Sequence, residues 1–136
     1  MFPQDSPKNP LAPRQYDLAS RAPIGSPIIV LTNLILEEGL RSKASAISLV
    51  ASAESCLVRY SIAGEWQEVM KVPDVWGKQV MNRLRLMAGL EPTTKGRRTG
   101  EIHCILDGAL VILTVDAPAT PDGSQKITVT TPGTAA

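Results

Sequence analysis

The sequence predicts an α+β domain in which two helices pack on an antiparallel sheet. Two segments, residues 27–43 and 74–89, carry apolar side chains at helical spacing. Short apolar or alternating runs follow each segment, and they are separated by turn residues such as Ala63-Gly64 and Asp107-Gly108. The expected order is therefore helix, three strands, helix, three strands.

The length of 136 residues and the hydrophobic content of 43% fit one compact domain with its own core. Residues 1–25 hold five prolines among polar residues, a composition that favours extended geometry and cannot fill a core. We expect a disordered Pro-rich tail over residues 1–25, either inert or a docking peptide. The folded domain is expected over residues 26–132 and a short C-terminal tail over residues 133–136.

The first helix is expected to begin at Pro27, because proline suits the first helical position, with Ser26 as its N-cap. Its apolar residues recur at spacings of three and four and predict a buried stripe, while charged residues gather toward the outer surface. The predicted stripe comprises Ile28, Leu31, Leu34 and Ile35, and the predicted outer residues are Glu37, Glu38, Arg41 and Lys43.

The first three strands are expected at residues 46–51, 56–62 and 65–69, as an antiparallel meander. Pro73 and Asp74 open the second helix, and Gly89 is placed as its C-terminal stop. The last three strands are expected at residues 102–106, 109–115 and 126–130. The side chains predicted to face inward from these elements include Leu49, Val58, Ile62, Val75, Val80, Leu84, Met87 and Ile112.

The near-neutral charge balance argues against a partner bound mainly by long-range electrostatic attraction. Fourteen basic and thirteen acidic side chains leave no global field that would attract nucleic acid or an anionic membrane. The apolar runs are shorter than the roughly 20 residues of a membrane-spanning helix, and the N-terminus lacks a signal pattern. We therefore expect no membrane insertion and a cytoplasmic location.

Metal and cofactor chemistry find little support in the residues. Cys56, Cys104 and the single histidine, His103, are too scattered for a zinc site. We expect both cysteines to be small core residues and expect no metal and no cofactor. An enzymatic dyad of His103 with a cysteine is an alternative, although neighbouring His103 and Cys104 would point to opposite faces of a strand.

Three sequence blocks resemble one family. The first helix fits the pattern P-I-V-x-L-x-N-x-I-L-x-E-A, residues 58–64 resemble V-R-x-R-I-D-G, and R-L-R-L-M-A-G-L at residues 83–90 resembles R-L-K-x-M-A-G-L. Together they resemble the second N-terminal, PAS-like domain of the type II secretion and type IV pilus assembly ATPase superfamily. The resemblance covers residues 26–132 and implies a PAS-like fold.

The chain departs from the family pattern at polar positions. Ala46, Ser48 and Val50 stand where the family has Asp, His and Glu in A-S-D-I-H-x-E-P. The resemblance implies arginines that approach a nucleotide held by the motor domain, but Glu101, Thr114 and Thr130 occupy three of those positions. The 136 residues also contain no G-x-x-x-x-G-K-[ST] motif. The departures imply a degenerate domain that does not hydrolyse ATP.

Candidate binding residues fall into two groups. Lys95, Arg97 and Arg98 lie close together on a predicted loop and form either an anion-binding or partner-binding patch or a solvated loop. The second group is a possible partner surface comprising Glu37, Glu38, Arg41 and Tyr16. Trp66 and Trp76 are expected to be buried, with an exposed interface anchor as the alternative.

The function that these observations predict is a non-catalytic interaction or adaptor module that docks on a secretion, pilus or related machine. Its expected partner is a protein component of that machine, and the chain itself is expected to be a monomer or homodimer. A PAS-like small-molecule sensor and an excised fragment of a full assembly ATPase are the alternatives.

Overall fold

The computed structural model describes residues 14–19, 26–90, 99–118 and 125–132. These residues form two helices and seven strands, which confirms the α+β class. The helices are α1 (Pro27–Arg41) and α2 (Asp74–Met87). The strands are β1 (Gln15–Asp17), β2 (Ala46–Ala51), β3 (Ser55–Ile62), β4 (Glu65–Pro73), β5 (Thr99–Leu106), β6 (Ala109–Asp116) and β7 (Gln125–Thr130).

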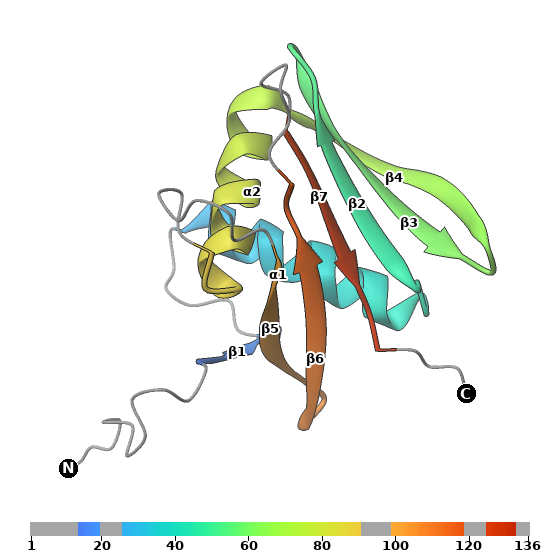
Figure 1. Ribbon diagram of the computed structural model, residues 1–136, viewed down its shortest axis with the longest axis vertical. Coiled ribbons are helices and arrows are strands. Elements are labelled where there is room, and N and C mark those ends of the chain that lie inside the picture. The colour runs from blue at the N-terminus through green and yellow to red at the C-terminus, as the bar shows by residue number, and fades with distance from the viewer. Residues whose placement is uncertain (1–13, 20–25, 91–98, 119–124, 133–136) are drawn as a thin grey trace.

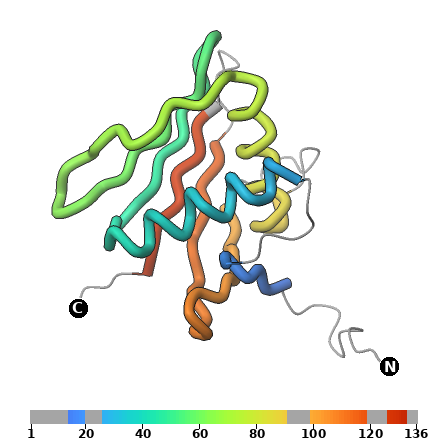
Figure 2. The backbone as a smooth tube through the Cα atoms, turned by 180° about the vertical axis from the view of Figure 1, so that it is seen from behind, coloured from blue at the N-terminus to red at the C-terminus, as the bar shows by residue number. Residues whose placement is uncertain are grey.

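All seven strands form one sheet in the order β1-β5-β6-β7-β2-β3-β4. The β1–β5 pair is parallel, and every other neighbouring pair is antiparallel. Both helices lie on the same side of the sheet, behind it in Figure 1 and in front of it in Figure 2. We call the covered side the helix face and the other side the open face. No helix in the described part of the chain is long and apolar enough to cross a membrane.

The core lies between the helix face and the two helices. Alternation along each strand sends every second side chain toward it. Ile47 and Leu49 of β2 and Leu113 and Val115 of β6 are all fully buried. Cys56 and Cys104 are buried free thiols, as expected of small core residues, and burial raises the pKa of Cys104 to about 11. The sheet is therefore sealed on one side by an aliphatic layer.

Two hairpin turns and one helix end match the sequence prediction. Ala63 and Gly64 have φ values of 54° and 84°, and Asp107 and Gly108 have φ values of 53° and 81°. Two successive left-handed residues match the twist of antiparallel strands, which explains the tight β3–β4 and β5–β6 connections. Gly89, with φ of 75°, follows Ala88, the C-cap of α2, and is the helix stop that the sequence predicts.

Helix α1 begins at Pro27 as predicted, but its buried stripe differs from the prediction. Thr32, Ile35, Leu36 and Gly39 are among its buried residues, whereas the predicted stripe residues Ile28, Leu31 and Leu34 are only partly buried. Gly39 centres the contact, because a Cβ atom there would lie 2.6 Å from Cδ1 of Ile47. Ser26 makes no side-chain capping hydrogen bond.

The structure also differs from the prediction of a disordered tail at residues 15–18. Gln15–Asp17 pairs in parallel with β5, and Leu18 follows as a fully buried core residue. The sequence contains too few apolar residues here to signal a strand, so tertiary packing of Leu18 explains the order. Residues 1–13, 20–25 and 133–136 lie outside the described residues.

Several side chains expected inside are exposed. Val75 is 64% exposed because the buried side of α2 runs through Gly77, Val80, Met81 and Leu84 instead. Ile112 is 39% exposed because its neighbours Val111 and Leu113 point toward the helix face. Ile62, near the end of β3, is only partly buried. The expectation that Val75 and Ile112 face inward is therefore wrong, whereas Ile62 packs against the core as expected.

Both tryptophans were expected to be buried, and that expectation is also wrong. Trp66 is 51% exposed and Trp76 is 42% exposed. Trp66 lies near the tip of the β3–β4 hairpin, which extends away from both helices in Figure 1. Trp76 lies in the first turn of α2. The two indole rings therefore belong to different surfaces of the molecule, one on the sheet and one on a helix.

Candidate functional site: a row of side chains across the open sheet face

One line of residues crosses six strands of the open face. Strand register places Glu101 opposite Thr114, Thr114 opposite Thr130, and Thr130 opposite Ala46. Ala46 in turn lies opposite Ser61, and Ser61 lies opposite Trp66. We call this line the transverse row. Its members are Glu101, Thr114, Thr130, Ala46, Ser61 and Trp66, one from each of β5, β6, β7, β2, β3 and β4.

Alternation explains why these side chains point away from the helices. Their chain neighbours Ile102, Leu113, Val129, Ile47 and Tyr60 are buried in the core. Within the row, Glu101, Thr114, Thr130 and Trp66 are exposed, and Ala46 is partly buried. Ser61 is only 9% exposed and is therefore the buried member of the row. The row is accessible at most of its positions.

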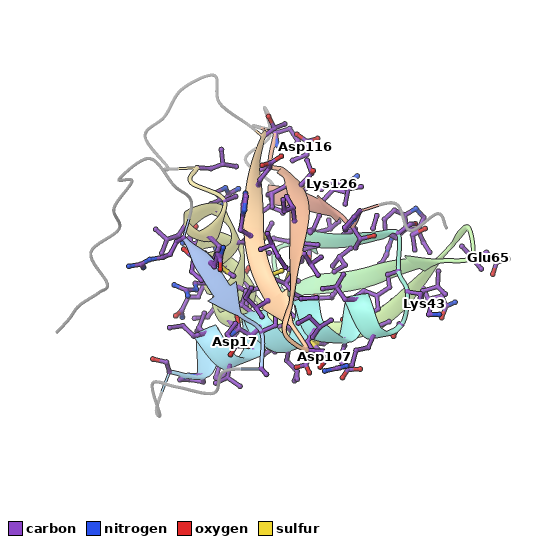
Figure 3. The ribbon with its side chains drawn as sticks, turned by 90° about the horizontal axis from the view of Figure 1, so that it is seen from below. Asp17, Lys43, Glu65, Asp107, Asp116 and Lys126 are labelled. Carbon is purple, nitrogen blue, oxygen red and sulfur yellow. The ribbon has the colours of Figure 1, made fainter. Side chains whose placement is uncertain are left out.

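A second line runs beside the transverse row. It places Asp116 opposite Thr128, Thr128 opposite Ser48, Ser48 opposite Arg59, and Arg59 opposite Glu68. Figure 3 shows Asp116 on the far side of the sheet from α1, with Lys126 near it. Short hydroxyl side chains, Ser48 and Thr128, therefore fill the centre of this line as well. Charged residues stand at its ends.

The transverse row brings together most of the departures from the family pattern. Glu101, Thr114 and Thr130 are the three positions at which the resemblance implies arginine, and Ala46 stands where it implies aspartate. Ser61 matches the second arginine of V-R-x-R, whereas Arg59 keeps the first. These positions are up to 84 residues apart in the chain. The fold therefore makes one continuous surface of changes that look unrelated in the sequence.

The chemistry of the row differs sharply from that of an arginine cluster. Guanidinium groups bind phosphate oxygens through paired, charge-assisted hydrogen bonds. Hydroxyl and methyl groups carry no positive charge, and the carboxylate of Glu101 would repel an anion. The row is thus a largely uncharged strip with an acidic end at β5 and an aromatic end at β4. Such a strip is better suited to contact with a protein surface than to binding of a phosphate.

Four members of the row, Glu101, Thr114, Thr130 and Ala46, are recognisable in the sequence as departures from the family pattern. Ser61 and Trp66 were not recognised as members of the site. The V-R-x-R block carries a signal for Ser61. Side chains alternate along a strand, so Arg59 and Ser61, the two positions that are arginine in this block, lie on one face of the sheet. The register that aligns the six strands has no local signal in the sequence. Trp66 joined the row only through its pairing with Ser61.

The predicted anion patch of Lys95, Arg97 and Arg98 lies outside the described residues.

The other predicted surface, comprising Tyr16, Glu37, Glu38 and Arg41, is not one exposed group. The expectation that Glu37 faces outward is wrong: it is buried, because its carboxylate packs against Arg41 with an N–O distance of 3.0 Å. The Tyr16 ring lies 5.3 Å below the Arg83 guanidinium. Glu38 is exposed.

Arg41 joins the end of α1 to the β5–β6 turn. Its Nη1 and Nη2 atoms donate hydrogen bonds of 3.0 and 3.1 Å to the two carboxylate oxygens of Asp107. Figure 3 shows Asp107 beside α1. The hydrogen bonds from Arg41 lower the pKa of Asp107, and those to Asp107 and Glu37 raise the pKa of Arg41. This arginine therefore has a structural role within the chain.

His103 and Cys104 diverge, in agreement with the strand alternation. The Nε2 atom of His103 lies 3.4 Å from Oε1 of Glu101, whereas the buried Cys104 thiol donates to the carbonyl oxygen of Val111 over 3.3 Å. The two side chains therefore do not form a local dyad. Within the described ranges, no group of three or more His, Cys, Asp or Glu side chains is placed to hold a metal ion.

Comparison with known proteins gives one relationship. The chain is 32% identical over 75 residues to the type IV pilus assembly ATPase PilB of Myxococcus xanthus. The matched stretch covers 55% of this chain and 13% of that ATPase, so the chain spans only a small part of its relative. No protein-family model matches the chain. The similarity supports a relation to the assembly ATPase family.

Proposed function

We propose that this chain is a non-catalytic interaction module that docks on a protein component of a type IV pilus or related secretion machine. In this proposal it corresponds to the PAS-like N-terminal domain of the assembly ATPases and acts in the cytoplasm. The similarity to a pilus assembly ATPase supports the choice of machine. The transverse row is the observation that carries the docking role.

The row supports docking because its fold is kept while its charged chemistry is replaced. Core residues on the helix face, such as Ile47 and Val129, are fully buried, so the sheet is intact. On the open face, the positions of arginine and aspartate in the family carry threonine, alanine, serine and glutamate. Desolvation of an uncharged strip against another protein costs little free energy, whereas desolvation of an unpaired arginine cluster would cost much more.

Trp66 provides an anchor at one end of this strip. Interfaces are enriched in tryptophan, and buried aromatic anchors carry much of their binding free energy. Trp66 is 51% exposed and lies opposite Ser61, whose small side chain leaves the indole ring uncovered on that side. We therefore place the docking surface on the open face, centred on the row and ending at Trp66.

Site-specific photocrosslinking in the native cell tests the proposal. A photoreactive amino acid replaces Thr130, in the middle of the row, and in a matched control it replaces Glu54, an exposed residue of the β2–β3 turn. Mass spectrometry identifies the captured proteins. We expect a pilus or secretion component from position 130 and not from position 54.

Two results would count against docking at the row. Capture of pilus components only from position 54 would move the interface to another surface. Capture of no pilus or secretion component from either position, with the protein expressed at its native level, would remove the proposed partner class.

A further inference from the structure

Strand β1 has the geometry of a bound peptide. It comprises only Gln15–Asp17 and pairs in parallel with the outer edge of β5, where Gln15, Tyr16 and Asp17 lie opposite His103, Cys104 and Ile105. It is the one parallel pair in the described sheet. A short extended segment added to a sheet edge is the common mode of β-strand augmentation.

Two side chains hold this segment in place. Leu18 is fully buried in the core, and its backbone N–H donates to the carbonyl oxygen of Ile105 over 3.0 Å. Tyr16 packs against the core, and the Arg83 guanidinium of α2 lies 5.3 Å from the centre of its ring, within the range of a cation–π interaction. The contacts therefore recognise an aromatic residue followed two positions later by leucine.

The residues between these anchors contribute less. Gln15 and Asp17 are exposed, and Asp17 uses a carboxylate oxygen to accept a hydrogen bond from the N–H of Ala19 within the segment itself. Main-chain pairing with β5 provides affinity, and the alternate side chains Tyr16 and Leu18 provide specificity, as in other augmented sheets. The site is thus defined by the β5 edge, Arg83 and the core position that Leu18 occupies.

We propose that the β5 edge and Arg83 form a peptide-binding groove that residues 15–18 fill in cis. In trans it takes an extended segment of a partner protein that carries an aromatic residue, any residue and then leucine, in parallel orientation to β5. The assignment of a partner protein in trans depends on the docking role proposed above, whereas the existence of the groove and its sequence specificity do not depend on it. The groove lies at the β1 edge of the sheet, distinct from the transverse row.

A cleavable form of the full chain tests the groove directly. A specific protease site is placed within residues 20–25, so that cleavage breaks the covalent link and allows the segment to dissociate. The probe is a fluorescein-labelled peptide of residues 13–19, and fluorescence anisotropy measures its binding before and after cleavage. Covalent attachment gives the cis segment a high effective concentration, so we expect at least tenfold tighter peptide binding after cleavage.

Matched peptides define the specificity. A peptide with Leu18→Asp should lose binding, and a peptide with Gln15→Ala should bind as the native sequence does. Equal binding of the Leu18→Asp and native peptides would overturn the proposal, as would no binding to a cleaved chain that has released its segment. A pilus component is absent from the assay, so its outcome is independent of the docking partner.

If cleavage unfolds the chain, which circular dichroism detects, a second variant tests the groove. In the full chain, Leu18→Ala leaves a cavity that the native peptide can fill with its own leucine. We expect this peptide, at saturating concentration, to raise the Tm of Leu18→Ala but not that of the wild type. An unchanged Tm of Leu18→Ala would contradict the groove.

Discussion

Thr114 and Thr130 lie directly opposite each other on β6 and β7, on the face of the sheet that the helices leave open. Each stands where the family pattern has arginine. Two arginines in such a cross-strand pair would repel each other unless an anion lay between them. Two threonines pack without that requirement. The pair therefore forms an uncharged part of the open face.

Arginine at either position should be tolerated by the fold. We expect Thr114→Arg and Thr130→Arg to change the free energy of unfolding by less than about 0.5 kcal/mol, because both side chains are exposed. Val115→Arg is the matched control, since Val115 is adjacent in β6 and fully buried. It should unfold the protein. Urea denaturation measures all three, and a severe loss for Thr130→Arg would contradict the assignment of the open face.

The Tyr60 hydroxyl ties the sheet to α1. It is buried and donates a 2.7 Å hydrogen bond to the backbone carbonyl of Ile35. Tyr60→Phe removes the donor and leaves a buried carbonyl with less hydrogen bonding, so it should lower the free energy of unfolding by about 1–3 kcal/mol. Tyr16→Phe keeps the ring that packs near Arg83 and should cost much less. Similar losses for the two variants would contradict this role.

The same hydroxyl should make stability fall in strong base. Burial, followed by the charge of Glu38, raises the pKa of Tyr60 to about 12 from an ordinary value of 10. The folded state therefore holds this proton more tightly than the unfolded state, so its contribution is complete below pH 10 and is lost as the pH rises toward 12. The stability difference between wild type and Tyr60→Phe, measured by denaturation from pH 8 to 12, should shrink across that window. A constant difference would show that the hydroxyl does not titrate in this way.

The two exposed tryptophans offer a matched test of which surface docks. Trp66→Ala should weaken binding to the partner captured at position 130 by about tenfold or more, as expected of an aromatic anchor. Trp76→Ala, on α2, should leave the affinity unchanged. Titration calorimetry with the purified partner measures both. If Trp76→Ala is the damaging variant, the helical side is the interface.

The sequence predicted the elements better than it predicted their faces. Asp107-Gly108 and Ala63-Gly64 each end in a glycine, which accepts the left-handed backbone that they adopt, so local turn signals located both hairpins. Glu37 was expected outside from its charge, but Arg41 neutralises it and Asp107 holds that arginine, a contact across 66 residues. Such long-range pairing leaves no local signal, and the same is true of β1, whose order depends on Leu18 entering a distant core.

The candidate site was accessible to sequence reasoning only as separate substitutions. Glu101, Thr114 and Thr130 were recognised one at a time against the family pattern. Their alignment with Ala46 and Ser61 depends on the register of five strands, which follows from the packing of the whole helix face. The sequence therefore indicated separate departures from the family pattern, and the fold aligned them in one row.

Quantitative affinity enrichment from native cells tests the docking role most directly. Three proteins are compared at equal expression: the wild type, Thr130→Arg in the row and Ser52→Arg in the exposed β2–β3 turn. A large charged side chain in the row should block close contact, so we predict that the wild type and Ser52→Arg enrich the same pilus or secretion component and that Thr130→Arg loses it. Equal enrichment by all three proteins, or no such component with any of them, would contradict a docking module that uses the open face.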